Sequence, residues 1–91
     1  MASIVVGTTS TALVAFSVSK SLILKAAPGN AGVIYFGYTN AVTADTNVTN
    51  DGIPLSAGNI VELEPYRCGN TSAGVYVIAS AASQKLFYDA R

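Results

Sequence analysis

Short apolar runs of β-branched and aromatic residues alternate along the chain with clusters of Gly, Pro, Asn, Asp and Ser. Helical periodicity is weak, and this spacing is typical of an all-β domain. We predict about seven short strands, at residues 4–6, 12–18, 22–24, 33–38, 60–64, 75–79 and 85–88. The economical way to bury their apolar faces is a small antiparallel β-sandwich or barrel, formed by one domain over residues 1–91.

The clearest two-residue alternation places Val61 and Leu63 on one side of a strand and Glu62 and Glu64 on the other. Such alternation is expected of a strand that turns one face to the core and the other to water. Pro65 follows and cannot donate a hydrogen bond to a β-ladder. We therefore expect this strand to end just before the proline.

A second alternating segment covers residues 12–18. Its even positions are Val14, Phe16 and Val18, and its odd positions are small or polar. The pattern predicts a strand with Val14, Phe16 and Val18 turned inward.

Residues 33–38 are apolar at odd and even positions alike, which predicts a strand covered on both faces, in a sandwich core or against a partner. The last two strands, 75–79 and 85–88, are separated by the small residues 80–83. This short connection predicts a terminal β-hairpin.

Composition points to a subunit rather than a free monomer. The chain is 51% apolar, only 11% charged and without net charge, so its outer surface is unusually neutral for a small domain. No basic stripe exists to meet phosphates, and nucleic-acid binding is not expected.

The first cationic side chain is Lys20, and no run of about 20 apolar residues occurs, so neither a signal peptide nor a membrane span is expected.

The residue types needed for most catalytic sites are missing. The chain has no His and a single cysteine, Cys68, so Ser-His-Asp and Cys-His arrangements and internal disulfides are excluded. A lone thiol suits a reducing cytosol. Arg67 beside Cys68 could activate the thiol, but packing in a loop is the favoured interpretation. We expect neither an enzyme nor a cofactor.

A polar loop that ends in an Asp-Gly pair carries Asp45, Asn47 and Asp51 and invites a calcium interpretation. The EF-hand pattern fails, because its sixth position is Asn50 instead of Gly and its twelfth is Ser56 instead of Glu. Three oxygen donors also fall short of the six to eight that calcium takes. Turn chemistry explains the loop better, and no metal site is predicted.

Glu62 and Glu64 form the one pair of carboxylates on a shared strand face, separated by about 7 Å from the strand rise. Paired carboxylates can hydrolyse glycosides. Nothing nearby predicts a cleft or a raised pKa, so a solvated face or a rim of ion pairs is the favoured interpretation.

The five tyrosines are large, stiff and amphipathic. They can fill the core and its rim, or they can serve as anchors at a subunit interface, and the sequence does not separate these alternatives. The scattered cations do not form the groove that a nucleic-acid stacking platform needs. The candidate interface residues are therefore Tyr35, Tyr38, Tyr66, Tyr76 and Tyr88.

From Ala26 onward the order of features resembles a known pattern. Val-Ile-Tyr-Phe-Gly-Tyr at 33–38 precedes Gly-Ile-Pro-Leu at 52–55, Gly58 and an alternating strand, and Val-Tyr-Val-Ile-Ala-Ser at 75–80 precedes Gln84 and Lys85. This order resembles small β-sandwich virion proteins of tailed bacteriophages, of the capsid decoration (cement) or head-fibre type. The resemblance covers about two thirds of the chain and departs from the pattern at residues 41–50 and 68–72.

The resemblance implies a non-enzymatic protein of the virion, assembled in the bacterial cytoplasm and bound to the major capsid protein on the outer surface of the shell. It also implies a homo-oligomer, expected as a trimer. Residues 1–25 lie outside the resemblance and are expected to be an arm or strand used in docking or oligomerisation. Two alternatives stay open: a head-fibre base, neck or tail accessory protein, and a carbohydrate-binding module for host attachment.

Overall fold

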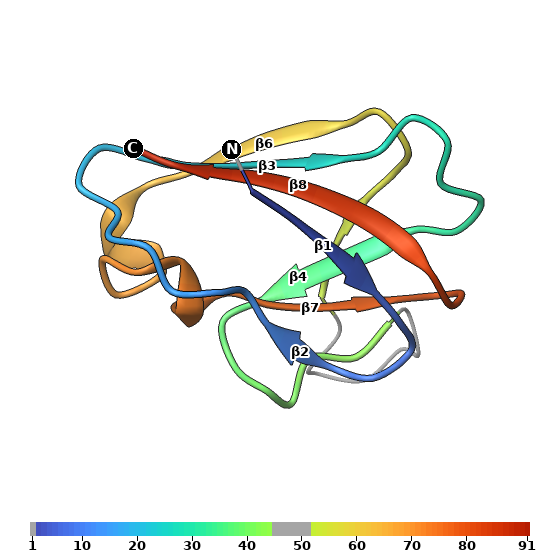
Figure 1. Ribbon diagram of the computed structural model, residues 1–91. Helices are drawn as coiled ribbons and strands as arrows, with labels where there is room; N and C mark the ends of the chain where they lie inside the picture. Colours follow the sequence, from blue (N-terminus) through green and yellow to red (C-terminus); the bar gives the residue numbers. More distant parts are fainter. Residues whose placement is uncertain (1, 45–51) are drawn as a thin grey trace.

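A computed structural model describes residues 2–44 and 52–91, which form two antiparallel four-stranded sheets packed face to face (Figure 1). The first sheet has the order β1-β8-β3-β6 and the second has the order β2-β7-β4-β5. The strands are β1 (Ala2–Val6), β2 (Thr11–Ala12), β3 (Leu22–Ala26), β4 (Ile34–Gly37), β5 (Ile53–Leu55), β6 (Ile60–Leu63), β7 (Tyr76–Ala79) and β8 (Gln84–Ala90). Two single-turn 3-10 helices, η1 (Pro65–Arg67) and η2 (Ser72–Gly74), connect β6 to β7. The predicted all-β sandwich class is confirmed.

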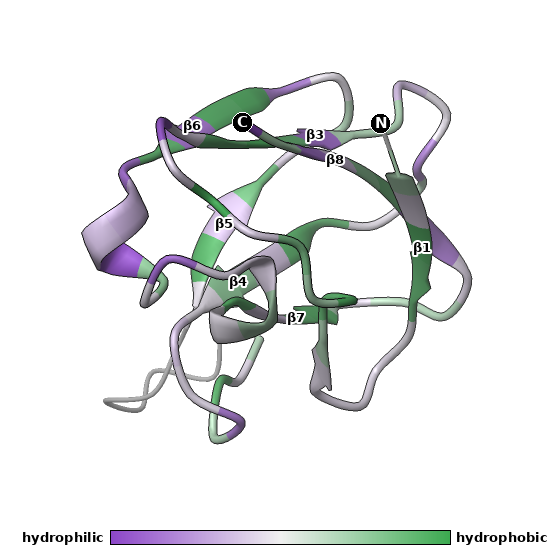
Figure 2. Ribbon diagram, turned by 60° about the vertical axis from the view of Figure 1, so that its left-hand side comes forward, coloured by the Kyte–Doolittle hydropathy of each residue, from purple (hydrophilic) through white to green (hydrophobic). Residues whose placement is uncertain are grey.

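The core lies between the two sheets because alternate residues of each strand point inward. In β3, Leu22, Leu24 and Ala26 are buried while Ile23 and Lys25 are partly exposed. Hydrophobic residues occur in the strands of both layers (Figure 2). The buried cluster contains Val6, Leu13, Val18, Leu22, Leu24, Ala26, Ile34, Phe36, Leu55, Leu63, Cys68, Val75, Val77, Ala79, Leu86 and Tyr88.

The described residues contain eight strands, one more than the seven predicted. The additional strand is β5, which pairs with β4 and carries Pro54 in its middle. Because β5 is an edge strand, one side of its backbone needs no ladder hydrogen bonds and a proline is tolerated.

The alternation in β6 is confirmed. Leu63 is buried and Val61 half-buried, whereas Glu62 is exposed, and η1 begins at Pro65. The prediction for β4 is also confirmed, since Ile34 and Phe36 lie in the core and Tyr35 is buried on the opposite face.

The prediction of an inward-facing strand over 12–18 is wrong. Only Thr11–Ala12 forms a strand, paired with β7, and Val14 and Phe16 are 61% and 47% exposed. Of the three residues predicted to point inward, Val18 does so, and the other inward anchor of the segment is Leu13. Because the chain leaves the sheet after Ala12, strand periodicity no longer determines which residues point inward.

The predicted terminal hairpin is also wrong. β7 pairs with β2 and β4, and β8 pairs with β1 and β3, so the connection 80–83 crosses from one sheet to the other. Side chains stabilise this crossing: the Gln84 side-chain oxygen accepts from the Gly32 amide at 2.8 Å, and the Ser80 hydroxyl accepts from the Val33 amide at 3.0 Å. A four-residue link can connect either arrangement, and sequence pattern alone favoured the more local one.

The N-terminal segment belongs to the sandwich within this chain. β1 pairs with β8 over Ala2–Val6, and β3 is an interior strand between β8 and β6. The sequence left open whether residues 1–25 form an arm or a strand. The described residues 2–25 supply strands and core side chains to the sandwich.

Candidate interaction surfaces

The five candidate tyrosines occupy three environments. Tyr88 is 2% exposed and fills the core, which is the first of the two alternatives left open for these residues. Tyr35 is buried on the outer face of the second sheet, and Tyr76 is half-buried on the same face. Tyr38 and Tyr66 are exposed.

Tyr38 and Tyr66 both lie near Arg67, although they are 28 positions apart in the sequence. Tyr38 directly follows β4, and η1 carries Tyr66 and Arg67. The Arg67 guanidinium lies 5.5 Å from the centre of the Tyr66 ring and its Nε lies 3.6 Å from a Glu64 carboxylate oxygen. We call these four residues the Arg67 cluster: two exposed rings, one cation and one carboxylate.

The charges of the Arg67 cluster shift the pKa values of its members. A hydrogen bond to the Glu64 carboxylate raises the pKa of the Tyr66 hydroxyl above its ordinary value, because it favours the protonated phenol. The pKa of Arg67 is also raised, by the charge of an ionised Tyr66 and then by Glu64, with a smaller contribution from Tyr38. The Arg67 and Glu64 side chains are about half exposed and Tyr66 is more exposed still, so the cluster is an arrangement on the surface and not a buried ion pair.

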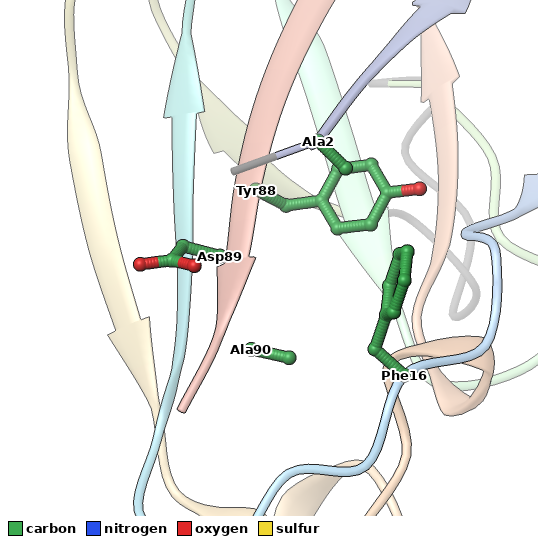
Figure 3. A pocket seen from close by; sticks show the side chains of 5 residues that line it. All are labelled: Ala2, Phe16, Tyr88, Asp89 and Ala90. Carbon is green, nitrogen blue, oxygen red and sulfur yellow. The ribbon is translucent and has the colours of Figure 1, made fainter.

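A partly open pocket of about 300 Å³ lies between β8 and the segment 13–18. It is lined by Ala2, Phe16, Tyr88, Asp89 and Ala90. The rings of Phe16 and Tyr88 lie 6.2 Å apart at an angle of 52°, and the Asp89 carboxylate points away from them (Figure 3). The pocket is therefore mainly apolar.

Hydrogen bonds from distant residues hold the segment 13–18 in place. The buried Ser72 hydroxyl accepts from the Phe16 amide at 2.8 Å and donates to the Val14 carbonyl at 2.5 Å. The Val14 amide donates to the Tyr88 hydroxyl at 3.2 Å. These bonds satisfy a backbone that has left the sheet, and they leave Val14 and Phe16 projecting outward. Nothing in the local sequence around Ser72 indicates this role.

The outer face of the first sheet mixes apolar and charged side chains. Val5 and Ile60 are 67% and 63% exposed, and Ile23 and Phe87 are partly exposed. The Lys85 ammonium lies 5.3 Å from the centre of the Phe87 ring. The outward residues are Ser3, Val5, Ile23, Lys25, Ile60, Glu62, Lys85, Phe87 and Asp89.

The other sequence candidates occupy ordinary structural positions. Glu62 and Glu64 are exposed, and Glu64 is paired with Arg67. Cys68 is a buried member of the core cluster with its thiol 3.6 Å from the Pro65 carbonyl oxygen, which confirms the packing interpretation. Asp45, Asn47 and Asp51 lie outside the described residues. In the ranges 2–44 and 52–91, no three His, Cys, Asp or Glu side chains are grouped so that they could hold a metal ion.

The accessible area of the chain is 4804 Å², close to the roughly 5,000 Å² expected for a compact monomer of this mass. The high apolar content therefore does not make the molecule less compact. It affects which side chains are exposed on the surface. Over the part of the chain described, no helix is long and apolar enough to cross a membrane.

The fold and its surfaces define the class: a small antiparallel β-sandwich whose notable outward features are apolar and aromatic side chains. In comparisons with protein-family models, curated proteins and solved structures, nothing matches this chain.

Proposed function

We propose that this protein is a non-enzymatic structural subunit that acts by binding other proteins, as a decoration (cement) protein on the outer surface of a bacteriophage capsid. The supporting observation is the set of large apolar side chains that a compact sandwich without net charge leaves exposed. These are Val5, Val14, Phe16, Tyr38, Ile53, Ile60 and Tyr66. Scattered single apolar residues are normal on a monomer, but this number on so small a chain favours covered surfaces.

The proposed mechanism is geometric. Each copy would cover apolar surface shared by neighbouring capsid subunits, so rupture of the shell would have to break those contacts as well. At about 25 cal/mol per Å² of apolar area, 300 Å² per copy contributes about 7 kcal/mol before the costs of association. Repetition over the shell multiplies this contribution.

The phage setting is supported by the resemblance of residues 26–85 to small virion proteins. It brings with it the major capsid protein as partner and a trimer as the expected oligomer. The reading frames next to this one provide an inexpensive first test, since a capsid or portal gene there would support the setting.

The direct test mixes the purified protein with shells assembled from the neighbouring capsid protein. We expect co-sedimentation with the shells and a higher temperature of shell rupture. Phe16→Ser is expected to weaken binding, whereas Thr8→Ala, an exposed polar change, serves as the matched control. Absence of binding at saturating protein would contradict the decoration function. A dozen or fewer copies per particle would instead favour the head-fibre base, neck or tail accessory alternative.

A second candidate function is carbohydrate binding for host attachment, and the Arg67 cluster favours it. Exposed aromatic rings beside hydrogen-bonding charged groups are suited to sugar faces and hydroxyls, and the structure brings Tyr38 and Tyr66 together around Arg67. Binding on a glycan array that disappears in Tyr66→Ala and Tyr38→Ala, but not in Phe16→Ala, would support this function. A protein that binds no glycan would remove it.

A further inference from the structure

The outer face of the first sheet is less polar than an open sheet face requires. An antiparallel sheet with one face in water usually alternates apolar and polar residues cleanly. Here four of the nine outward residues are large and apolar: Val5, Ile23, Ile60 and Phe87.

Strand register places three of these residues on one diagonal line. Val5 lies opposite Lys85 on β8, and Phe87 is two residues further along β8. Phe87 lies opposite Lys25 on β3, and Ile23 is two residues before Lys25. Diagonal neighbours of this kind are about 8 Å apart. We call Val5, Phe87 and Ile23 the apolar diagonal.

The charged residues are unevenly distributed about the apolar diagonal. Lys85 and Lys25 lie along one side of it, opposite Val5 and Phe87 respectively, and Glu62, opposite Ile23, lies further along the same side. Ser3 and Asp89 lie along the other side, opposite Phe87 and Ile23. Asp89 also forms an ion pair with Arg91 at 3.3 Å.

The placement of Lys25 and Asp89 on opposite sides of the diagonal makes the face complementary to a copy of itself. A two-fold axis along the apolar diagonal stacks the diagonal on its own copy and exchanges the two flanks. The spacing between strands (about 4.8 Å) and between residues along a strand (about 3.3 Å) gives the outcome of this rotation. Measured in the plane of the sheet, Lys25 comes to lie within about 3 Å of the position of the partner's Asp89. Lys85 comes to lie over the partner's Ser3.

We propose that the outer face of the first sheet binds the same face of a second copy of this chain around such a two-fold axis. The apolar diagonal supplies the contact area, and two equivalent Lys25–Asp89 pairs between the copies set the orientation. In an isologous contact of this kind both copies use the same surface patch, so each contact between two residues occurs twice.

The proposed interface is small. Four strands at about 4.8 Å and seven residues at about 3.3 Å give a face of about 19 by 23 Å, or about 440 Å². A standard interface buries about 800 Å² per partner, so we expect a weak, concentration-dependent dimer. The proposal does not rest on capsid binding, and a dimer can form whether or not the decoration function holds.

Analytical ultracentrifugation of the full chain alone, over concentrations up to about 1 mM, tests the proposal, because this range reaches weak complexes. Lys25→Glu and Asp89→Lys are each expected to raise the dimer dissociation constant at least tenfold, since each places like charges opposite one another. The double variant, Lys25→Glu with Asp89→Lys, is expected to restore it. Arg67→Glu, a charge reversal away from this face, is the matched control.

Thermal unfolding of each variant shows whether it is folded. If Asp89→Lys does not fold, Val5→Glu replaces it, because Val5 is an exposed member of the diagonal. Val5→Glu is expected to leave the melting temperature unchanged and abolish the dimer. The proposal is overturned by a monomer at every concentration, by an oligomer of any size that is indifferent to these changes, or by a folded double variant that fails to recover.

Discussion

The outer faces of the two sheets differ in how they are covered. On the second sheet, the segment 38–44 folds back so that Val42 is buried against Gly37, Tyr35 and Gly52. On the first sheet, Val5 and Ile60 stay largely exposed among lysines and carboxylates. Both faces contain apolar residues, and on the second face the segment 38–44 covers part of the sheet around Tyr35.

The difference shows how a short chain handles a surplus of apolar residues. Covering the second face requires two glycines, because a side chain at Gly37 or Gly52 would occupy the space that Val42 fills. The first face has no glycine in β1, β3, β6 or β8 and alternates its apolar residues with charges. We therefore interpret the second face as part of the fold and the first as the surface available to a partner.

Disrupting the cover of the second sheet should have the largest effect. A Cβ at Gly52 would lie 2.8 Å from both Tyr35 Cβ and Val42 Cγ2. Gly52→Ala should therefore destabilise the protein by about 2 kcal/mol, measured by urea unfolding. Gly29→Ala meets nothing within 4 Å and is the control, with stability unchanged or slightly raised. Equal effects of the two variants would mean that the cover does not pack tightly.

Truncation at matched valines compares the two faces directly. Val42→Ala removes two buried methyl groups and should cost about 1.5 kcal/mol of unfolding free energy. Val5→Ala, at an exposed position of the first sheet, should change stability by less than about 0.5 kcal/mol in dilute protein. A larger loss in Val5→Ala than in Val42→Ala would reverse our interpretation of the two faces.

The smallest expected effect is a change in the pKa of Tyr66, which lies in η1 where the covering segment 38–44 approaches it. Because the Glu64 hydrogen bond raises the pKa of Tyr66, Glu64→Gln should lower that pKa toward the ordinary tyrosine value. Because the pKa of Tyr66 is higher in the folded state, it stabilises the fold slightly at any pH below the ordinary tyrosine pKa. This contribution disappears as the pH rises through the folded-state pKa. NMR titration of labelled tyrosines measures the shift, and Glu62→Gln should leave Tyr66 unchanged.

Sequence pattern predicted some elements well and others badly. It located β6 and β4 because alternation and two-sided apolarity are local properties that match the pleat. It failed at 12–18, where the outward turn of Val14 depends on the hydroxyls of Tyr88 and Ser72, distant along the chain. A local pattern contains no information about such partners.

The candidate surfaces show the same division. The tyrosines were singled out by type, but their sequence positions did not reveal that Tyr88 would be internal or that Tyr38 and Tyr66 would approach Arg67. The apolar diagonal depends on the order β1-β8-β3, which places side by side residues up to 86 positions apart, such as Ala2 and Tyr88.

Local sequence was sufficient to specify an all-β chain of short strands, because apolar periodicity and turn residues act within a few positions. Composition was sufficient to predict a neutral surface without the residues that most catalytic sites use. Tertiary structure decided that β7 and β8 belong to opposite sheets, that Val42 covers part of one outer face, and that charges flank an apolar diagonal on the other. These features depend on strand pairing between distant segments, which is selected by burial of the whole core rather than by any single segment.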